Sequence, residues 1–441
     1  MPLSETGALN DGSGVPDIPT PPNTAAGRQL SWLLQVINER ADQLLPKEIQ
    51  QHFQDGFLRV VPSEDLLAEF SSLAHEQAPL TFLEISPDTS DMSLLALVEG
   101  NRARLTIGMN IEPGTEKISG LQFTAVETRT DAQPLDSWQA IDQSVATLAP
   151  SAQYLVARVG VNECESLHSS APEKQLALGS SFGLYVLAEL ARQLEAGVMG
   201  WDTPVTIEDA LKSLPSGELQ YLSQGSQVSI RELAEKMIAL SDNTAADHLM
   251  ALLGRENIEA GLAAAGHQAP QLNVPFLSTR ELFLFRLEVA EQETEAYLSG
   301  DVSTRREFLS KLAGHSPRLE STVGWVLPRR IEQLEWFASS DDLCRLMLSL
   351  QTRSQAPGLA PLREVLSRDP GLPLDSEIFP YVAFKGGSEP GVLNLTWLVE
   401  RHDGTRFFVS LGLNDPTAPI LDNASVLRTA FAIFDLLGVS N

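Results

Sequence analysis

The chain has 441 residues, more than one hydrophobic core normally supports, so we expect two domains. Hydrophobic residues make up 43% and charged residues 20%, a composition that excludes a wholly disordered protein. With 31 Lys and Arg against 58 Asp and Glu, the formal net charge is −27, and such a surface repels phosphate backbones, so we expect no nucleic-acid partner.

The sequence indicates no membrane span, metal or cofactor. Apolar runs stay well short of the ~20 residues that a membrane span needs, and no basic segment followed by an apolar one begins the chain. We therefore expect no transmembrane segment and a cytoplasmic location, or a secreted or periplasmic one if a signal peptide was removed. Cys164 and Cys344 lie far apart without metal or redox spacing, which favours two buried thiols and leaves a disulfide open.

The first part of the chain predicts a tail and a small α+β domain. Residues 1–27 are rich in Pro, Gly, Ser, Asp and Asn, which indicates a disordered tail. Apolar spacing predicts helices near residues 30–45 and 66–73. Strands are expected at residues 80–85, 94–98, 104–111 and 118–126. This domain, residues 28–130, has no clear catalytic cluster, so we expect an accessory role in packing or substrate gating.

A polar segment before Pro134 predicts a boundary, and the second domain, residues 135–441, contains the first chemical motif. After a short helix and a strand at residues 153–160, the segment 176–183 leads into an apolar helix that runs to about residue 197. Ser180 thus lies at a helix start, where backbone N–H groups and the macrodipole stabilise an oxyanion. Simple helix capping by Ser180 or Ser181 is the alternative role.

Two further segments present polar side chains. Ser229 and Glu232 predict a capping box for a helix over residues 230–240, which ends at Ser241-Asp242-Asn243 before a second helix. Farther on, Lys385-Gly386-Gly387-Ser388 ends a predicted strand, and residues 392–399 and 406–413 predict a hairpin. Glycines beside a lysine on a strand let a substrate approach the backbone closely.

This order of motifs resembles the penicillin-binding protein and class A β-lactamase superfamily, in which S-x-x-K is followed by S-D-N and K-T-G. The resemblance covers about residues 150–441 and implies an α+β fold, an antiparallel sheet flanked by helices. With its small first domain, the chain is most similar to two-domain bacterial members of the clavulanic-acid-cluster type, whose N-terminal domain is steroid-isomerase-like. The long interval between Ser241 and Lys385 implies an insertion near residues 290–335.

The resemblance also implies a role for each matching residue. Ser180 would be the acylated nucleophile, Ser241 a proton relay to the leaving group, and Lys385 an electrostatic anchor for the substrate carboxylate. Backbone N–H groups of Ser180 and Ser388 would form the oxyanion hole. The substrate-binding residues would be Asn243, Gly387 and Ser388. The implied substrates are small molecules: β-lactams, esters or peptide-like acyl compounds.

Two departures from the superfamily pattern stand out. Gly183 occupies the position, one helical turn after Ser180, where the superfamily has the lysine that helps to deprotonate the serine. Loss of a general base costs about 10²–10⁴ in rate. The deacylating E-x-x-L-N loop of class A β-lactamases is also missing, and for its only candidate, Glu281, we favour the role of a helix-start residue.

These departures leave two functional hypotheses. We expect a slow or altered serine hydrolase or acyl-transfer enzyme in which Lys385 activates Ser180 through Ser241. The alternative is a catalytically inactive protein that keeps the cleft and Lys385 to bind a carboxylate-bearing small molecule.

A third motif competes for the same segment. Residues 179–183 match G-x-S-x-G, the α/β-hydrolase elbow, with Ser181 as nucleophile. That fold needs an alternating βα series and a late catalytic histidine, whereas the last histidine, His402, falls in the predicted hairpin turn. We therefore favour the β-lactamase-like interpretation.

Overall fold

The computed structural model describes residues 20–58, 61–85, 92–101, 103–112, 114–128, 134–315, 325, 327–420 and 423–439. The chain divides into two compact units, Met1–Asp131 and Ala132–Asn441. Most of the predicted tail and of the predicted boundary falls outside the described residues. Helix α1 (Ala25–Gln35) begins two residues before the predicted end of the tail, because Thr24 caps it and its first residues are buried.

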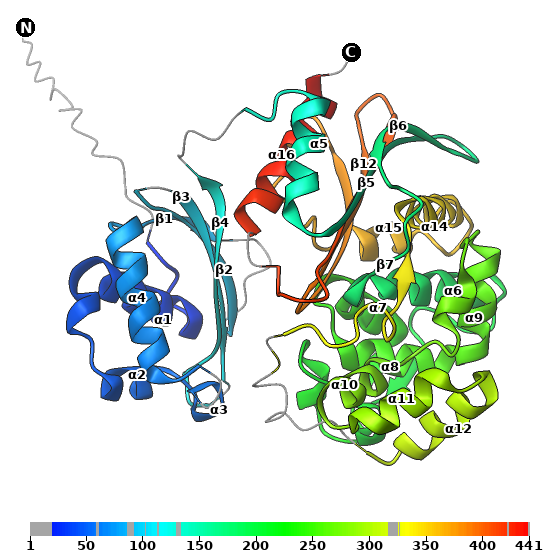
Figure 1. Ribbon diagram of the computed structural model, residues 1–441, viewed down its shortest axis with the longest axis horizontal. Coiled ribbons are helices and arrows are strands. Elements are labelled where there is room, and N and C mark those ends of the chain that lie inside the picture. The colour runs from blue at the N-terminus through cyan, green and yellow to red at the C-terminus, as the bar shows by residue number, and fades with distance from the viewer. Residues whose placement is uncertain are drawn as a thin grey trace, which may run out of the picture. The chain divides into compact units, whose positions relative to one another are not determined.

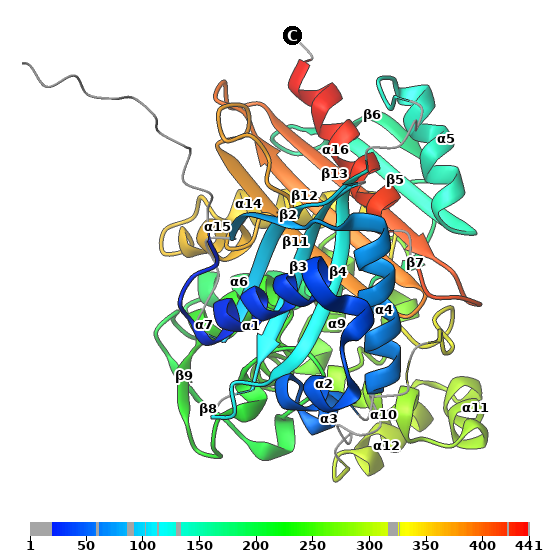
Figure 2. The same ribbon diagram turned by 90° about the vertical axis from the view of Figure 1, so that its left-hand side faces the viewer.

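The N-terminal unit is a four-stranded antiparallel sheet with helices on one face (Figures 1 and 2). Its strands are β1 (Thr81–Ile85), β2 (Ser93–Glu99), β3 (Ala103–Ile111) and β4 (Ile118–Thr128), in that order, and each predicted strand is confirmed. The helices are α1, α2 (Pro46–His52), α3 (Asp55–Leu58) and α4 (Ser63–Gln77). Fully buried Leu30, Phe70 and Ile107 belong to the core between the two layers.

One predicted helix in this unit is broken. The apolar stripe over residues 30–45 continues past α1 as a π-helical segment, Val36–Arg40, and a 3₁₀ turn, Ala41–Gln43. The helix type changes, yet Val36, Ile37 and Ala41 all remain buried. Burial of these apolar side chains therefore stabilises the segment although its regular α-helical hydrogen bonds are lost.

The C-terminal unit contains a five-stranded antiparallel sheet in the order β11-β12-β13-β5-β6. The strands are β11 (Tyr381–Glu389), β12 (Val392–Glu400), β13 (Arg406–Asn414), β5 (Ser151–Val159) and β6 (Cys164–Ser170). Two short two-stranded sheets pair β7 (Leu176–Ala177) with β10 (Phe337–Ala338) and β8 (Pro204–Thr206) with β9 (Gln227–Ser229). The predicted hairpin is formed by β12 and β13.

Helices cover both faces of the five-stranded sheet (Figure 1). Because side chains alternate along β12, Trp397 and Val399 join a core with α5 (Trp138–Leu148) and α16 (Asn423–Val439), while Leu398 joins the opposite core. That opposite core is built largely by α6 (Gly183–Glu195), α7 (Ile230–Ala239), α8 (Asn243–Leu253) and α14 (Ser340–Arg353). The predicted α+β class, an antiparallel sheet flanked by helices, is confirmed.

Further helices fill the interval between the second and third motifs. They are α9 (Arg255–Ala264), α10 (Thr279–Leu287), α11 (Glu291–Ser299), α12 (Val302–Leu312) and α15 (Pro361–Leu366). Helices α11 and α12 lie within the range of the predicted insertion, residues 290–335, and residues 316–324 and 326 of that range lie outside the described residues. Within the described ranges, the helices lack the length and apolar character needed to cross a membrane.

The two cysteines form a disulfide, so the interpretation of two separate buried thiols was wrong. Cys164 begins β6 and Cys344 lies in α14, and their Cα atoms are 6.4 Å apart. The two elements pack against each other beside β5, which brings together residues separated by 180 positions. Sequence spacing alone could not show this proximity, because it depends on how α14 crosses the sheet.

Candidate active site

The nucleophile segment forms a tight turn before helix α6. A 3₁₀ turn, Gly179–Phe182, leads into α6, and Gly179 adopts a left-handed φ of 52°, which favours glycine. Ser180 is partly exposed, whereas Ser181 is fully buried and its hydroxyl lies 3.5 Å from the Lys385 carbonyl oxygen. Ser180 is therefore the accessible serine, and an elbow with Ser181 as nucleophile does not fit this antiparallel fold.

Strand β11 runs against this turn, backbone to backbone. A Cβ at Gly387 would lie 2.0 Å from the Leu178 carbonyl oxygen and 2.7 Å from the Ser180 nitrogen, so only glycine fits there. A Cβ at Gly179 would in turn lie 3.1 Å from the Ser388 nitrogen. The nucleophile turn and the end of β11 therefore approach each other closely at Ser180 and Ser388, the two predicted oxyanion-hole donors. Their catalytic role stays a prediction.

Lys385 lies beneath this contact and reaches the second motif. Its Nζ donates to the Ser241 Oγ at 2.6 Å and to the Gly386 carbonyl at 2.6 Å, and the residue is 1% exposed. Burial lowers the pKa of Lys385 to about 7, although the charge of Asp369 works against this shift. Near neutral pH a substantial fraction of Lys385 is therefore uncharged and can accept a proton from Ser241.

The Ser241-Asp242-Asn243 turn is held in an unusual conformation. Ser241 has a φ of 51°, a left-handed conformation that costs roughly 1–3 kcal/mol for a residue other than glycine. Asp242 caps α8 by accepting from the Ala245 N–H, and its second oxygen accepts from two further backbone N–H groups. Asn243 is 4% exposed and donates to the Leu214 carbonyl at 3.0 Å. These bonds fix the direction of the Ser241 hydroxyl.

Met237 occupies the space beside Gly183. A Cβ at position 183 would lie 3.4 Å from the Met237 Cγ, 3.6 Å from its Sδ and 3.7 Å from the Lys385 Cε. A side chain at 183 would therefore begin in van der Waals contact with Met237, which is 2% exposed, and near the Lys385 Cε. Its significance could not be read from the sequence, since Met237 matches an ordinary apolar position of helix α7.

The start of helix α10 carries Glu281, the candidate deacylating base in the sequence. Glu281 closes a capping box with Ser278 and forms an ion pair with Arg255 at 2.6 Å, so its expected role as a helix-start residue fits. Asp247, which the sequence analysis missed, accepts from the backbone N–H groups of Thr279 and Arg280 and from the Thr279 hydroxyl. Burial raises the pKa of Asp247 to about 7. Its contacts anchor α10 to α8.

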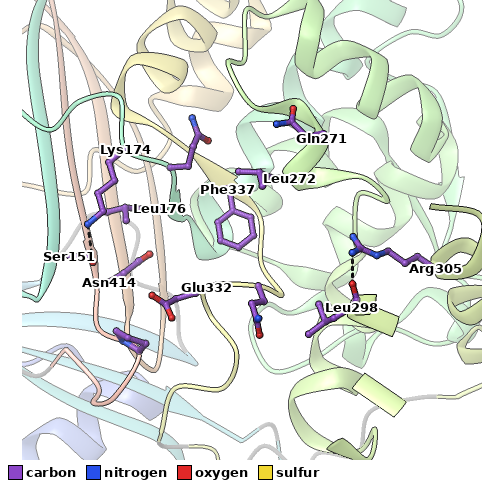
Figure 3. A pocket seen from close by; sticks show the side chains of 13 residues that line it. Ser151, Lys174, Leu176, Gln271, Leu272, Leu298, Arg305, Glu332, Phe337 and Asn414 are labelled. Atoms are coloured by element: carbon purple, nitrogen blue, oxygen red, sulfur yellow. Dashed lines mark hydrogen bonds between the residues drawn. The ribbon is translucent and has the colours of Figure 1, made fainter. Parts of the chain in front are cut away.

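A separate cavity of about 590 Å³ lies beside the β7–β10 pair (Figure 3). Lys174 and Leu176 line one part of it and Arg305 and Leu298 another, with Phe337 between them in the view. None of the residues predicted for catalysis or substrate binding lines this cavity. It is therefore distinct from the cluster around Ser180, Ser241 and Lys385.

Two parts of the chain match the models of known protein families. Residues 159–425, more than half of the chain, match the model of the beta-lactamase enzyme family. The chain belongs to the beta-lactamase enzyme family. Residues 21–113 of this beta-lactamase family member match the model of the ORF 12 gene product N-terminal domain. No curated protein matches the sequence.

Solved structures similar to this beta-lactamase family member include enzymes and a penicillin-binding protein. The beta-lactamase of Sphaerobacter thermophilus DSM 20745 gives a TM-score of 0.48 at 16% identity, covering 69% of this chain and 98% of its own. A class A beta-lactamase representative of Bacteroides cellulosilyticus DSM 14838 gives a TM-score of 0.47 at 16% identity, and the match covers 70% of this chain and 100% of that protein's chain. A mutant of PBP-A, in an acyl-enzyme complex with penicillin-G, gives a TM-score of 0.44 at 16% identity, and the match covers 69% of this chain and 98% of that protein's chain.

The family model confirms the predicted resemblance to the β-lactamase superfamily. The structure brings four of the six predicted site residues into two contacts, since Gly387 lies against the Ser180 nitrogen and Lys385 binds Ser241. Ser388, the fifth, lies against Gly179, the residue before Ser180. Asn243, the sixth, begins the next helix after Ser241. What the motifs could not reveal is the surrounding support, such as Met237, because those residues carry no distinctive pattern.

Proposed function

We propose that this protein is a serine hydrolase or acyl-transfer enzyme of the β-lactamase and penicillin-binding type, with Ser180 as the acylated nucleophile. The observation that carries the proposal is the 2.6 Å contact between Lys385 Nζ and Ser241 Oγ. A buried lysine with a pKa of about 7 can act as a base near neutral pH. This supports a relay in which Lys385 replaces the lysine that is absent at position 183.

In this relay, Ser180 Oγ attacks the substrate carbonyl carbon while its proton passes to Ser241. Ser241 gives its own proton to the neutral Lys385, which becomes an ammonium. Backbone N–H groups of Ser180 and Ser388 stabilise the negative charge on the former carbonyl oxygen. When the intermediate collapses, the bond to the leaving group breaks, and that group takes a proton back through Ser241. Because this relay needs two coupled proton transfers, we expect acylation to be slower than it would be with a single base that takes the Ser180 proton directly.

The substrate class follows from the same residues. A β-lactam, an ester or a peptide-like acyl compound offers a carbonyl to Ser180, and protonated Lys385 suits a carboxylate on the same molecule. Deacylation has no identified base, since Glu281 is committed to a capping box and an ion pair. We therefore expect acyl-enzyme formation to outpace its hydrolysis. The N-terminal unit serves as an accessory domain in this proposal.

The second candidate is a β-lactamase-like binding protein without catalysis. Met237 favours it, because this apolar side chain packs against the position where the missing lysine would begin. Such a protein would recognise a carboxylate-bearing small molecule through Lys385.

Covalent labelling separates the two candidates. The protein is incubated with a reactive penicillin and, separately, with a fluorophosphonate, and its intact mass is then measured. A mass increase of one adduct, located on Ser180 by peptide mapping, supports the enzyme. Saturable binding of the penicillin without any adduct from either reagent supports the binding protein.

A further inference from the structure

A buried arginine outside the recognised motifs connects three segments of the C-terminal unit. Arg286, in helix α10, is 1% exposed. Its Nε lies 3.2 Å from a carboxylate oxygen of Glu389, and its Nη2 lies 3.1 Å from a carboxylate oxygen of Glu335. Its remaining Nη1 donates to the Arg329 carbonyl. One guanidinium thus binds three partners from outside its own helix.

The first partner lies beside one side of the catalytic cluster. Glu389 is the last residue of β11 and directly follows Ser388. Burial raises the pKa of Glu389, and the Arg286 charge acts in the opposite direction, so the ion pair helps to keep the carboxylate charged. Arg286 therefore holds the end of the strand that carries Ser388.

The second partner leads to the nucleophile turn. The other Glu335 oxygen accepts from the Trp336 backbone N–H at 2.9 Å, and the Trp336 carbonyl accepts from the Leu178 N–H at 2.9 Å. The Trp336 ring stacks on Phe182, with centroids 3.9 Å apart. Leu178 and Phe182 each lie two residues from Ser180 in the sequence, one before it and one after it. The contacts of Trp336 therefore hold the chain on both sides of the nucleophile.

We propose that Arg286 is a positioning residue that sets the separation of the Ser180 and Ser388 backbone N–H groups by holding Glu335 and Glu389 together. This inference rests on the proposed function, in which those two groups form the oxyanion hole. Donors in such a hole act only when they are aimed at the developing charge, with tolerances of about 0.5 Å. The rigid planar fork of arginine is suited to fixing two carboxylates at once.

The partner variants test the inference without removing the buried guanidinium. Glu389→Ala frees the end of β11, whereas Glu389→Gln keeps an oxygen that accepts from Arg286. Glu189→Ala is the matched control, because Glu189 is also a buried carboxylate that forms an ion pair with an arginine, Arg192, at 2.7 Å. This ion pair lies within helix α6 and involves neither β11 nor the nucleophile turn. All three variants are first compared with the parent protein by thermal unfolding.

The kinetic readout is phosphonylation of Ser180 by a fluorophosphonate, in which the serine oxygen bonds to phosphorus and fluoride leaves. The measurement separates the reversible affinity from the bond-forming rate. Loss of a single oxyanion donor costs about 10²–10³ in rate, so we expect a displaced donor in Glu389→Ala to slow bond formation about 10- to 100-fold. Reversible affinity should change less than about twofold, Glu389→Gln should recover most of the rate, and Glu189→Ala should lose stability without losing rate. Equal rate losses in Glu389→Ala and Glu189→Ala would overturn the inference.

Amide hydrogen exchange provides a readout that does not need catalysis. In Glu389→Ala, exchange should rise together in peptides covering residues 178–183 and 385–390, and Glu189→Ala should show no such joint rise. If the parent protein is not acylated but this joint rise occurs, the proposed function fails and the positioning role stands. If exchange rises only in residues 385–390, Arg286 does not connect the two segments and the inference is wrong.

Discussion

The Nζ of Lys385 lies 2.6 Å from the Oγ of Ser241, and the Cε of the same lysine would lie 3.7 Å from a Cβ at position 183. The amine thus reaches the catalytic cluster from strand β11 rather than from helix α6. The same lysine is proposed to take a proton and to bind a substrate carboxylate. The first task needs the neutral amine and the second needs the ammonium, so the two tasks have opposite pH requirements.

Acylation by a neutral ester should become faster as pH rises through about 7. Burial lowers the pKa of Lys385 to about 7, so the amine is mostly protonated below that pH and mostly neutral above it. Only the neutral form accepts the proton that Ser241 passes on. The measurement is the burst rate with an activated ester between pH 5.5 and 8.5. A rate that falls with rising pH, or an inflection near 10, would contradict the relay.

Binding of a carboxylate-bearing β-lactam should show the reverse trend and depend on Lys385. Lys385→Met keeps a side chain of similar length without the charge, and we expect it to weaken binding by more than about 1 kcal/mol, the scale of a charge-assisted hydrogen bond. In the parent protein, affinity should fall above pH 7. Calorimetry with Ser180→Ala, which cannot be acylated, isolates the reversible step. Unchanged affinity in Lys385→Met on that background would remove Lys385 from the site.

Covalent labelling should disappear in Ser180→Ala and persist in Ser181→Ala. Ser180 is partly exposed, whereas Ser181 is fully buried with its hydroxyl 3.5 Å from a carbonyl oxygen, so removing that hydroxyl costs little. The measurement is intact mass after fluorophosphonate treatment, with circular dichroism as the folding control. Label mapped to Ser181 would contradict this assignment.

The motifs predicted the centre of the site because each depends on local backbone chemistry. Ser229 and Glu232 predicted the start of α7, and the intact Ser241-Asp242-Asn243 triplet predicted the turn that follows it. The glycines after Lys385 predicted that a substrate approaches the backbone there, whereas the structure shows Gly387 packed against the backbone of the Ser180 segment. Local spacing was sufficient for the helix start and the turn, and the alternating strands of both units were predictable for the same reason.

The supporting contacts could not be predicted, because they join distant parts of the chain. Arg286 and Glu389 are separated by 103 positions, and Cys164 and Cys344 by 180. A buried arginine in an amphipathic helix looks like an exposed one in the sequence, since charge alone does not report burial. The break in the helix after α1 was also hidden, because its apolar stripe stays buried through the change in helix type.

Reduction of the Cys164–Cys344 disulfide should destabilise the C-terminal unit. The bond joins β6 to α14 across a long loop, and loss of a native disulfide typically costs about 2–5 kcal/mol. We expect the urea midpoint of the reduced, alkylated protein to fall below that of the oxidised protein. A thiol count under denaturing conditions is the control and should be zero before reduction. Two free thiols in the purified native protein would contradict the pairing.

Gly183 and Met237 should act together on the rate of acylation. Gly183→Lys places an amine one helical turn from Ser180, and lysine is also a better helix former than glycine. Met237, however, lies 3.4 Å from where the new Cβ would be, so the lysine side chain must pack against it. We therefore expect Gly183→Lys alone to give a modest gain in acylation rate. Gly183→Lys with Met237→Ala, which opens that space, should give a larger one.

The gain should be confined to acylation. A direct base is worth about 10²–10⁴ in rate, so the double variant should show a clear burst with an activated ester. Turnover of a penicillin should stay slow, because Glu281 remains committed to its capping box and to its ion pair with Arg255. Met237→Ala alone is the control and should gain nothing. If the double variant folds normally yet shows neither a burst nor an adduct, the cleft is not built for serine acylation, and the binding-protein interpretation replaces the enzyme.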